Sequence, residues 1–477
     1  MKFAAKAILL TALGSTFAFA QISSFVHIVV VVQENRTPDN LFQGLCIPPY
    51  GSSGACGTSP GQYDIQSFGL NRKGDNVALN AVPLGNGYDP DHTHAGFERM
   101  CNASAGSYQC NNDGLISVNC PNKCSFEYVQ PTDVYPYLTL AQTYGWANSM
   151  FQTNQGPSSP AHQFIFGGTS APSAEADSNA EFVAENPSGK GCLAPLNAVY
   201  KLISPQSAPH EFDLINNPMG TVCFSRPTMA TLLEAAGYDW KYYSPGENNI
   251  WTAPNWISDI CGPNASYTKC VGDEWTKHVD LNPQHLLTAD LPACQLRPVS
   301  WVIPTGQNSD HPSSDGTHTG GPSWVSGIIN AIAESGCTDT VNGVQVPYWQ
   351  DTAVIVTWDD WGGFYDHRQP TFLSAPNQGL GDYQLGFRVP LLFVSAYTSP
   401  MIDSTNQYDV GSILRFIEQN FSIPEGALGF ADQRSQTDLT AFVNFGLRPR
   451  QFHHIKAPLS LEFLMNDHRP MDPPDND

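Results

Sequence analysis

Pairs of oxygen-bearing side chains directly follow two strongly apolar runs of the sequence. Glu34 and Asn35 come after the first run, and Asp359 and Asp360 come after the second. Carboxylate and amide oxygens are suitable ligands for divalent cations, and such an ion can act as a Lewis acid and charge clamp in phosphate ester hydrolysis. If the two runs are strands of one sheet, the four side chains predict a metal site.

A structural interpretation of the same residues is also open. Glu34 can cap a following helix, and the two aspartates can begin a turn before Gly362 and Gly363. Either pair alone is compatible with both interpretations.

A serine in the segment 154–162 is a candidate nucleophile. The turn Gly156-Pro157 is followed by Ser158, Ser159 and a further proline, which predicts that a serine lies at a helix N-terminus. The backbone N–H groups and the dipole of such a terminus favour an anionic phosphoryl group. The alternative is a serine that only caps the helix.

Apolar runs and helical patterns predict the elements that position these residues. Three runs, rich in β-branched or other apolar residues, have the character of strands buried on both faces of a parallel sheet: 26–32, 353–357 and 389–394. Helical patterns lie between them at 228–236, 325–333 and 410–420. We expect an α/β fold with a mainly parallel central sheet and helices on both faces, whose strand carboxyl ends carry the site.

Long segments without periodicity are predicted to be insertions into this fold. Residues 38–130 and 170–225 are rich in Gly, Pro, Ser, Asn and Cys, so we expect loops pinned by disulfides. The predicted organisation is one catalytic domain over 21–468 and a disordered acidic tail over 469–477.

The first twenty residues have the pattern of a secretory signal peptide. Lys2 and Lys6 precede an apolar stretch, and small residues lead to a predicted cleavage after Ala20. We therefore expect a secreted or periplasmic protein without an integral membrane segment. A formal net charge of −22 makes nucleic acids and anionic membrane surfaces unsuitable partners.

The twelve cysteines predict up to six disulfides in an exported chain, with a pairing that the sequence does not determine. Zinc binding by Cys120 and Cys124 is the alternative for that close pair.

Six motifs together resemble a known family. They are 27–37 (HIVVVVQENRT), 89–92 (DPDH), 156–158 (GPS), 309–312 (SDHP), 357–367 (TWDDWGGFYDH) and 412–418 (SILRFIE). The chain resembles the phosphoesterase family that joins bacterial phospholipases C, plant non-specific phospholipases C and acid phosphatases, and that is similar in fold to the alkaline phosphatase superfamily. The resemblance spans nearly the whole chain after the predicted signal, in the family's order.

The resemblance implies roles for the five residues introduced above. Ser158 would be the nucleophile that forms a phosphoseryl intermediate, and it would also contact the metal. Glu34, Asn35, Asp359 and Asp360 would be the other metal ligands. The ion would be calcium, magnesium, manganese or zinc, since oxygen ligation leaves its identity open.

The resemblance also implies roles for two histidines. His92 and His311 would lie around the phosphate, where they could stabilise its oxygens or protonate the leaving alcohol. Four others are expected to be structural or solvated: His94, His318, His453 and His454.

The sequence departs from the family pattern at two places. Asp360 stands where the family has a longer glutamate, and Pro160-Ala161-His162 stands where the family has Pro-Asn-Arg. His162 could therefore take over a phosphate contact or be a helix-surface or core residue.

The sequence predicts a secreted, metal-dependent phosphoesterase of the phospholipase C type. Its substrate would be a phospholipid head group or a small phosphomonoester, the second making it an acid phosphatase. A catalytically silent secreted binding protein is the alternative of another class. A sulfatase is disfavoured because no Cys or Ser lies in a Cys/Ser-x-Pro-x-Arg context. The oligomeric state is not predicted.

Overall fold

The computed structural model of the 477-residue chain describes most of the sequence. The described residues are 22–85, 88–103, 109–114, 124–185, 191–195, 198–204, 212–215 (backbone only), 222–247, 249–313, 315–373 and 383–474. The predicted signal peptide over 1–20 lies outside them.

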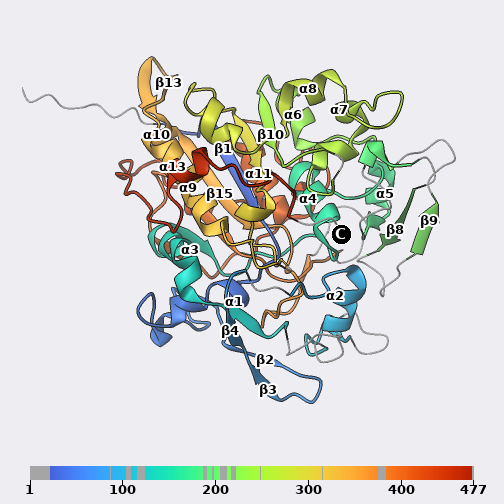
Figure 1. The fold of residues 1–477 in the computed structure, drawn as a ribbon, viewed down its shortest axis with the longest axis vertical. Coiled ribbons are helices and arrows are strands. Elements are labelled where there is room, and N and C mark those ends of the chain that lie inside the picture. Colours follow the sequence, from blue (N-terminus) through green and yellow to red (C-terminus); the bar gives the residue numbers. More distant parts are fainter. Residues whose placement is uncertain are drawn as a thin grey trace, which may run out of the picture.

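An eight-stranded sheet forms the centre of the molecule (Figure 1). Its strands, in spatial order, are β11 (Val279–Asp280), β10 (Trp240–Tyr243), β12 (Val299–Val302), β1 (His27–Gln33), β15 (Thr352–Trp358), β18 (Leu391–Val394), β6 (Gly145–Ala147) and β19 (Met401–Asp403). β18 is antiparallel to both of its neighbours, and every other pairing is parallel. The predicted α/β fold with a mainly parallel sheet is confirmed.

The register between β1 and β15 brings the predicted ligands together. Both strands are buried at every position, as expected for continuous apolar runs in a covered parallel sheet. Gln33 at the end of β1 pairs with Trp358 at the end of β15. Glu34 and Asp359 therefore leave neighbouring strands at the same level of the sheet.

The helices pack in two groups about the sheet. One group contains α3 (Pro131–Thr143), α9 (Gly321–Glu334) and α13 (Leu461–Met465), and the other contains α4 (Ser158–Gly167), α6 (Met229–Ala235) and α11 (Val410–Asn420). In Figure 1, α3 and α9 lie to the left of β1 and β15, and α4 and α6 lie to the right. The three predicted helices are present.

Helix ends follow from local sequence signals. Thr228 and Asp409 cap α6 and α11 in capping boxes, so the observed bounds match the predicted ones closely. α9 begins four residues before the predicted start, because Pro322 is well suited to a first helical turn.

Short elements make up the predicted insertions. Within 38–130 they are α1 (Pro38–Leu41), β2 (Phe68–Leu70), β3 (Asn76–Ala78), β4 (Asn80–Val82), α2 (His94–Cys101) and β5 (Glu127–Val129). Within 170–225 they are α5 (Ala174–Ser178), β7 (Phe182–Val183), β8 (Val199–Ile203) and β9 (Phe212–Ile215). The remaining elements are α7 (Ser258–Cys261), α8 (Asp273–His278), the π-helix Leu286–Asp290, β13 (Thr338–Val341), β14 (Val344–Pro347), α10 (Tyr348–Asp351), β16 (Phe372–Leu373), β17 (Tyr383–Gln384) and α12 (Ala431–Arg434), with short 3-10 turns at Gln43–Cys46, Ser53–Ala55, Gly191–Leu193, Ala253–Trp256, Gly306–Asn308 and Thr440–Phe442.

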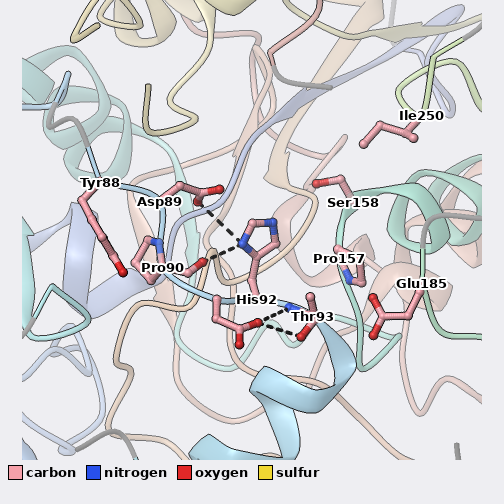
Figure 2. Close-up of a pocket in the computed structure, with 10 residues that line it drawn as sticks. Tyr88, Asp89, Pro90, His92, Thr93, Pro157, Ser158, Glu185 and Ile250 are labelled. Atoms are coloured by element: carbon pink, nitrogen blue, oxygen red, sulfur yellow. Dashed lines mark hydrogen bonds and ion pairs between the residues drawn. The ribbon is translucent and has the colours of Figure 1, made fainter. Parts of the chain in front are cut away.

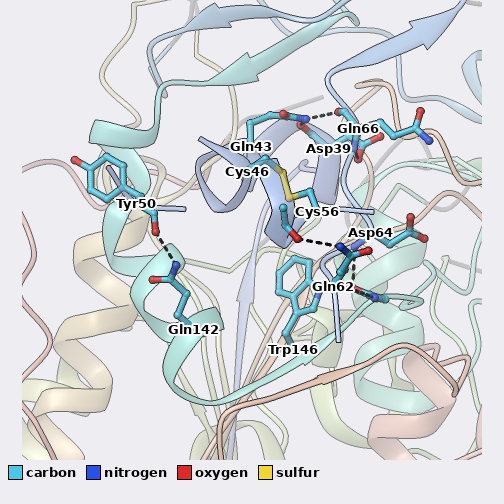
Figure 3. The surroundings of a disulfide bond; sticks show 12 residues. Asp39, Gln43, Cys46, Tyr50, Cys56, Gln62, Asp64, Gln66, Gln142 and Trp146 are labelled. Carbon is cyan, nitrogen blue, oxygen red and sulfur yellow. Dashed lines mark hydrogen bonds between the residues drawn. A yellow bond between two sulfur atoms is a disulfide. The ribbon is translucent and has the colours of Figure 1, made fainter. Parts of the chain in front are cut away.

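Disulfides staple the two insertions as predicted, and two further pairs lie after residue 225. The pairs are Cys46–Cys56, Cys101–Cys110, Cys192–Cys223, Cys261–Cys270 and Cys294–Cys337. Figure 3 shows the first pair, beside which Gln142 of α3 donates a hydrogen bond of 2.7 Å to the Tyr50 carbonyl. Cys124 is also disulfide-bonded, so zinc binding by Cys124 is contradicted, while Cys120 lies outside the described residues.

Part of the predicted tail over 469–477 contacts the domain. The Gly306 amide donates to the Asp472 carbonyl at 2.9 Å, and Arg469 donates to the Asn308 side chain at 2.7 Å. Residues 475–477 are not described. The division into one catalytic domain and a disordered tail stays a prediction. Over the described residues, we find no helix with the length and apolar character needed to cross a membrane.

Candidate active site

The chain turns sharply as it leaves β1. Asn35 has a φ of 58°, a left-handed conformation that asparagine tolerates better than most residues. Because of this turn, the backbone N–H of Asn35 donates to Asp359 Oδ1 at 3.0 Å, and the backbone N–H of Arg36 donates to the Asp360 carbonyl at 3.1 Å. The ends of β1 and β15 are thus joined through their first loop residues.

The turn after β15 needs glycine. Gly362 has a φ of 62°, and a Cβ there would lie 2.3 Å from the Asn35 carbonyl oxygen. The Gly362 amide donates to Asp360 Oδ1 at 2.7 Å. The absence of a side chain therefore allows close approach of the two loops and fixes one oxygen of Asp360.

The serine predicted at a helix N-terminus is the first residue of α4. Pro157 is the N-cap, and the Ser158 hydroxyl donates to Asp360 Oδ2 at 3.1 Å. Ser159 is buried, and its hydroxyl has no hydrogen-bond partner among the described residues. Of the two candidate serines, Ser158 is the one that contacts the carboxylate cluster.

His92 orients Asn35. His92 Nδ1 lies 2.8 Å from the Pro90 carbonyl, which can only accept, so Nδ1 carries a proton. In the neutral ring Nε2 then accepts from Asn35 Nδ2 at 3.2 Å. This bond fixes the amide of Asn35 with its Oδ1 turned away from His92.

His311 belongs to the same group of rings. Its Nδ1 donates to the Pro312 carbonyl at 2.6 Å, and its ring centroid lies 6.3 Å from that of His92. Figure 2 shows His92 and Ser158 on facing sides of the pocket, with the serine hydroxyl directed towards the ring. The structure therefore gathers all seven predicted site residues at one end of the sheet.

The oxygen atoms of this cluster fit a divalent cation. Asn35 Oδ1 and Asp359 Oδ2 are buried and have no hydrogen-bond partner among the described residues. Glu34, His162 and Asp359 each offer a donor atom, and these atoms lie within 4.8 Å of one another. A buried group of carboxylates in this arrangement requires positive charge, which a metal ion would supply.

His162 is part of the cluster and not a helix-surface residue. It is completely buried, and its Nε2 lies 3.5 Å from Glu34 Oε2 and 3.7 Å from Asp359 Oδ2. The sequence left open whether His162 is structural or takes a phosphate contact. Its place beside the two carboxylates is a third arrangement that the sequence did not indicate.

Burial perturbs the ionisable groups of the site. Burial, followed by the charge of Asp359, raises the pKa of Asp360 to about 8. Burial lowers the pKa of His162 to about 4, although the charge of Asp359 opposes this change. A cation bound among these oxygens would favour the charged carboxylates.

Two buried residues that sequence reasoning did not select support the site. Arg36 donates to the Asp310 carbonyl at 2.8 Å and to the Leu84 carbonyl at 3.1 Å. The Asp310 carboxylate accepts from the Tyr137 hydroxyl at 2.8 Å and from Trp358 Nε1 at 2.9 Å. Both lie inside recognised motifs, but only their burial reveals that they tie the loop of His311 to β1 and β15.

A pocket of about 400 Å³ opens beside Ser158 and His92 (Figure 2). Acidic side chains line it, namely Asp89, Asp91 and Glu185, together with the apolar or aromatic side chains of Tyr88 and Ile250. A group attached to a phosphate at Ser158 would face this acidic lining.

The four histidines that were expected to be structural or solvated have such positions. His94 is buried and donates to the Gln155 carbonyl at 2.8 Å. His318 lies beside the His311 carbonyl at 3.0 Å, and His453 and His454 are exposed.

Comparisons with known proteins place this chain in a phosphoesterase family. The model of the Phosphoesterase family matches residues 25–424. Phospholipase C B of Mycobacterium tuberculosis is 27% identical over 249 residues, covering 47% of this chain and 44% of that protein. Hemolytic phospholipase C of Pseudomonas aeruginosa is 22% identical over 476 residues, covering 89% of this chain and 56% of that protein. The chain thus spans about half the length of these curated relatives.

A solved structure of a protein in the alkaline phosphatase superfamily from Vibrio parahaemolyticus is 14% identical, covers 62% of each chain and has a TM-score of 0.33.

Proposed function

Because the chain belongs to the Phosphoesterase family, we propose that it is a phosphoric ester hydrolase in which Ser158 is the nucleophile. The observation that carries the proposal is the hydrogen bond from the Ser158 hydroxyl to Asp360, within a buried cluster that also contains Glu34, Asn35 and Asp359. Placement at the first turn of α4 supports the role, since the helix N-terminus attracts the phosphoryl oxygens.

The metal site of the proposal consists of Glu34, Asn35, Asp359, Asp360 and Ser158. A divalent cation bound there would supply charge stabilisation to the phosphoryl oxygens and favour ionisation of the serine hydroxyl. Asn35 Oδ1 and Asp359 Oδ2 support this assignment, because both are buried and have no hydrogen-bond partner among the described residues.

In the proposed first step, Ser158 Oγ attacks phosphorus while the bond to the leaving oxygen breaks. The hydrogen bond to Asp360 Oδ2 gives the serine proton an acceptor. We assign the proton for the leaving oxygen to His311 in its imidazolium form, which carries a proton on Nε2 as well as on the Nδ1 that donates to Pro312, because Nε2 of His92 is engaged by the Asn35 side-chain amide. Water then hydrolyses the phosphoseryl intermediate: its proton passes to the neutral His311 Nε2, and the serine recovers its proton from Asp360.

The acidic pocket favours a phosphodiester whose alcohol carries positive charge. Asp89 and Glu185 would attract a cationic head group, whereas a free phosphomonoester brings two negative charges to the same lining; the third acid, Asp91, is already paired with Arg99. Phospholipase C-like activity is therefore our first choice, and acid phosphatase activity is the second. The disulfides and the signal-like segment 1–20 support an exported location.

A substrate comparison tests the proposal. The rates on p-nitrophenylphosphorylcholine and p-nitrophenyl phosphate are measured side by side after EDTA treatment and after addition of single metals. We expect metal-restored activity with preference for the choline diester, and its loss in Ser158→Ala. Preference for the monoester would identify an acid phosphatase, and inactivity with every metal would favour a silent binding protein.

A further inference from the structure

His162 lies on the same face of α4 as the proposed nucleophile. It follows Ser158 by four residues, so the two side chains lie one above the other along the helix. Ser158 contacts Asp360, and His162 lies beside Asp359 and Glu34. One helix face therefore presents an oxygen and a nitrogen atom to the same cluster of carboxylates.

The spacing around His162 is unlike that of a simple hydrogen bond. Its Nε2 lies 3.5 Å and 3.7 Å from the two carboxylate oxygens, longer than the optimum of about 2.7–3.2 Å. Ligands at about 2.0–2.2 Å from one ion are themselves roughly 2.8–3.6 Å apart, from octahedral to tetrahedral geometry. The two distances from His162 Nε2 lie near the upper end of this range, and all three donor atoms lie within 4.8 Å of one another, so small shifts would let them share one cation.

The second ring nitrogen of His162 has no hydrogen bond that would compete with metal binding. His162 Nδ1 is buried and has no hydrogen-bond partner among the described residues. The edge-on contact with Trp251, at a centroid separation of 5.2 Å, constrains the ring plane. A completely buried imidazole is therefore held in place with Nε2 towards Glu34 and Asp359.

We infer that His162 is a nitrogen ligand of the metal centre and that the site consequently prefers zinc to calcium or magnesium. This inference rests on the proposed metal centre and specifies its donor set. Imidazole nitrogen is a favoured ligand of zinc, whereas calcium and magnesium prefer oxygen alone. The resembling family has an arginine at the position of His162, and an arginine could not bind a cation. A nitrogen ligand at this position would therefore distinguish this chain from the family pattern.

Metal titration of the EDTA-treated full chain tests the inference. Affinities for zinc and for calcium are measured by calorimetry for the wild type, His162→Ala and His94→Gln. His94 is the matched control, because it is also buried and donates to the Gln155 carbonyl at 2.8 Å, but it lies on α2 and contacts none of the proposed metal ligands through that bond. Circular dichroism checks that each variant is folded.

We expect His162→Ala to weaken zinc binding by at least tenfold and to change calcium binding by less than threefold, with the control unchanged. Cobalt provides a second readout: the visible spectrum of the cobalt-loaded wild type should change in His162→Gly and return on addition of imidazole. These results would support nitrogen ligation, which a merely structural histidine would not produce.

Unchanged zinc affinity and an unchanged cobalt spectrum in the His162 variants would overturn the inference while leaving the serine mechanism intact. A fall in vanadate affinity without a fall in zinc affinity would also overturn it, by assigning His162 to phosphate. Absence of any metal binding by the wild type would overturn both this inference and the proposed metal centre.

Discussion

The pH dependence of stability depends on one histidine behind the site. His367 Nδ1 lies 2.8 Å from Asp39 Oδ2, and its Nε2 lies 3.0 Å from Asp64 Oδ1. Figure 3 shows both aspartates beside the first disulfide. Burial lowers the pKa of His367, but the two aspartates outweigh burial and raise that pKa to about 9. The protonated ring holds the loop after β15 against α1 and the segment that follows it.

The size and direction of the effect follow from this pKa. The unfolded histidine has a pKa of about 6.5, so the folded state binds the proton more tightly by roughly 3 kcal/mol. This stabilisation is fully present below about pH 6.5 and is lost as the pH rises through about 9. His367→Gln should therefore destabilise the chain strongly at pH 6 and much less at pH 9.5.

Urea unfolding with the disulfides intact, at several pH values between 6 and 9.5, measures the difference between variant and wild type. His454→Gln is the control, because His454 is exposed, with a surface pairing to Glu334 and a long contact of 3.5 Å to the Asn330 side-chain amide. We expect the control to show almost no difference at any pH. A destabilisation by His367→Gln that is equal at pH 6 and pH 9.5 would refute the reasoning.

Three further changes have expected outcomes. Replacing Cys294 and Cys337 together by serine should reduce the free energy of unfolding by about 4 kcal/mol in urea titrations, since the disulfide closes a loop with a sequence separation of 43; no loss would contradict this pairing. Gly362→Ala should reduce metal affinity at least tenfold, because its Cβ would collide with the Asn35 carbonyl oxygen. Gly237→Ala, at an open left-handed position, is the control and should cost only about 1 kcal/mol of stability. Equal metal affinity in both variants would refute this. Arg36→Lys should destabilise the fold by about 2–4 kcal/mol, because an ammonium group cannot serve the separated acceptors of the guanidinium, and an unchanged thermal midpoint would contradict it.

The sequence predicted the sheet, and the edge at which the candidate site residues emerge, because these depend on local patterns. The continuous β-branched run of β1 identifies a buried strand, and the side chains directly after it must emerge at the carboxyl edge. The motifs also predicted the family, and the match over 25–424 confirms it.

Other features depend on contacts between distant segments. The antiparallel direction of β18 follows from its pairing with β6 and β15, which an apolar run does not encode. The position of His162 depends on how α4 packs against the loop ends, and the binding of the 469–474 segment depends on Asn308 and Gly306. Local sequence patterns do not encode these contacts between distant segments.

Trapping of a phosphorylated serine tests the central claim most directly. The metal-loaded wild type and Ser158→Ala are mixed with p-nitrophenylphosphorylcholine, quenched in acid during turnover and digested for peptide mass spectrometry. Because p-nitrophenol is the leaving group, the account predicts one added phosphorylcholine group on the wild-type peptide that contains Ser158, and none in the variant. Turnover at the wild-type rate by Ser158→Ala, or a phosphorylcholine group on another residue in both proteins, would contradict it.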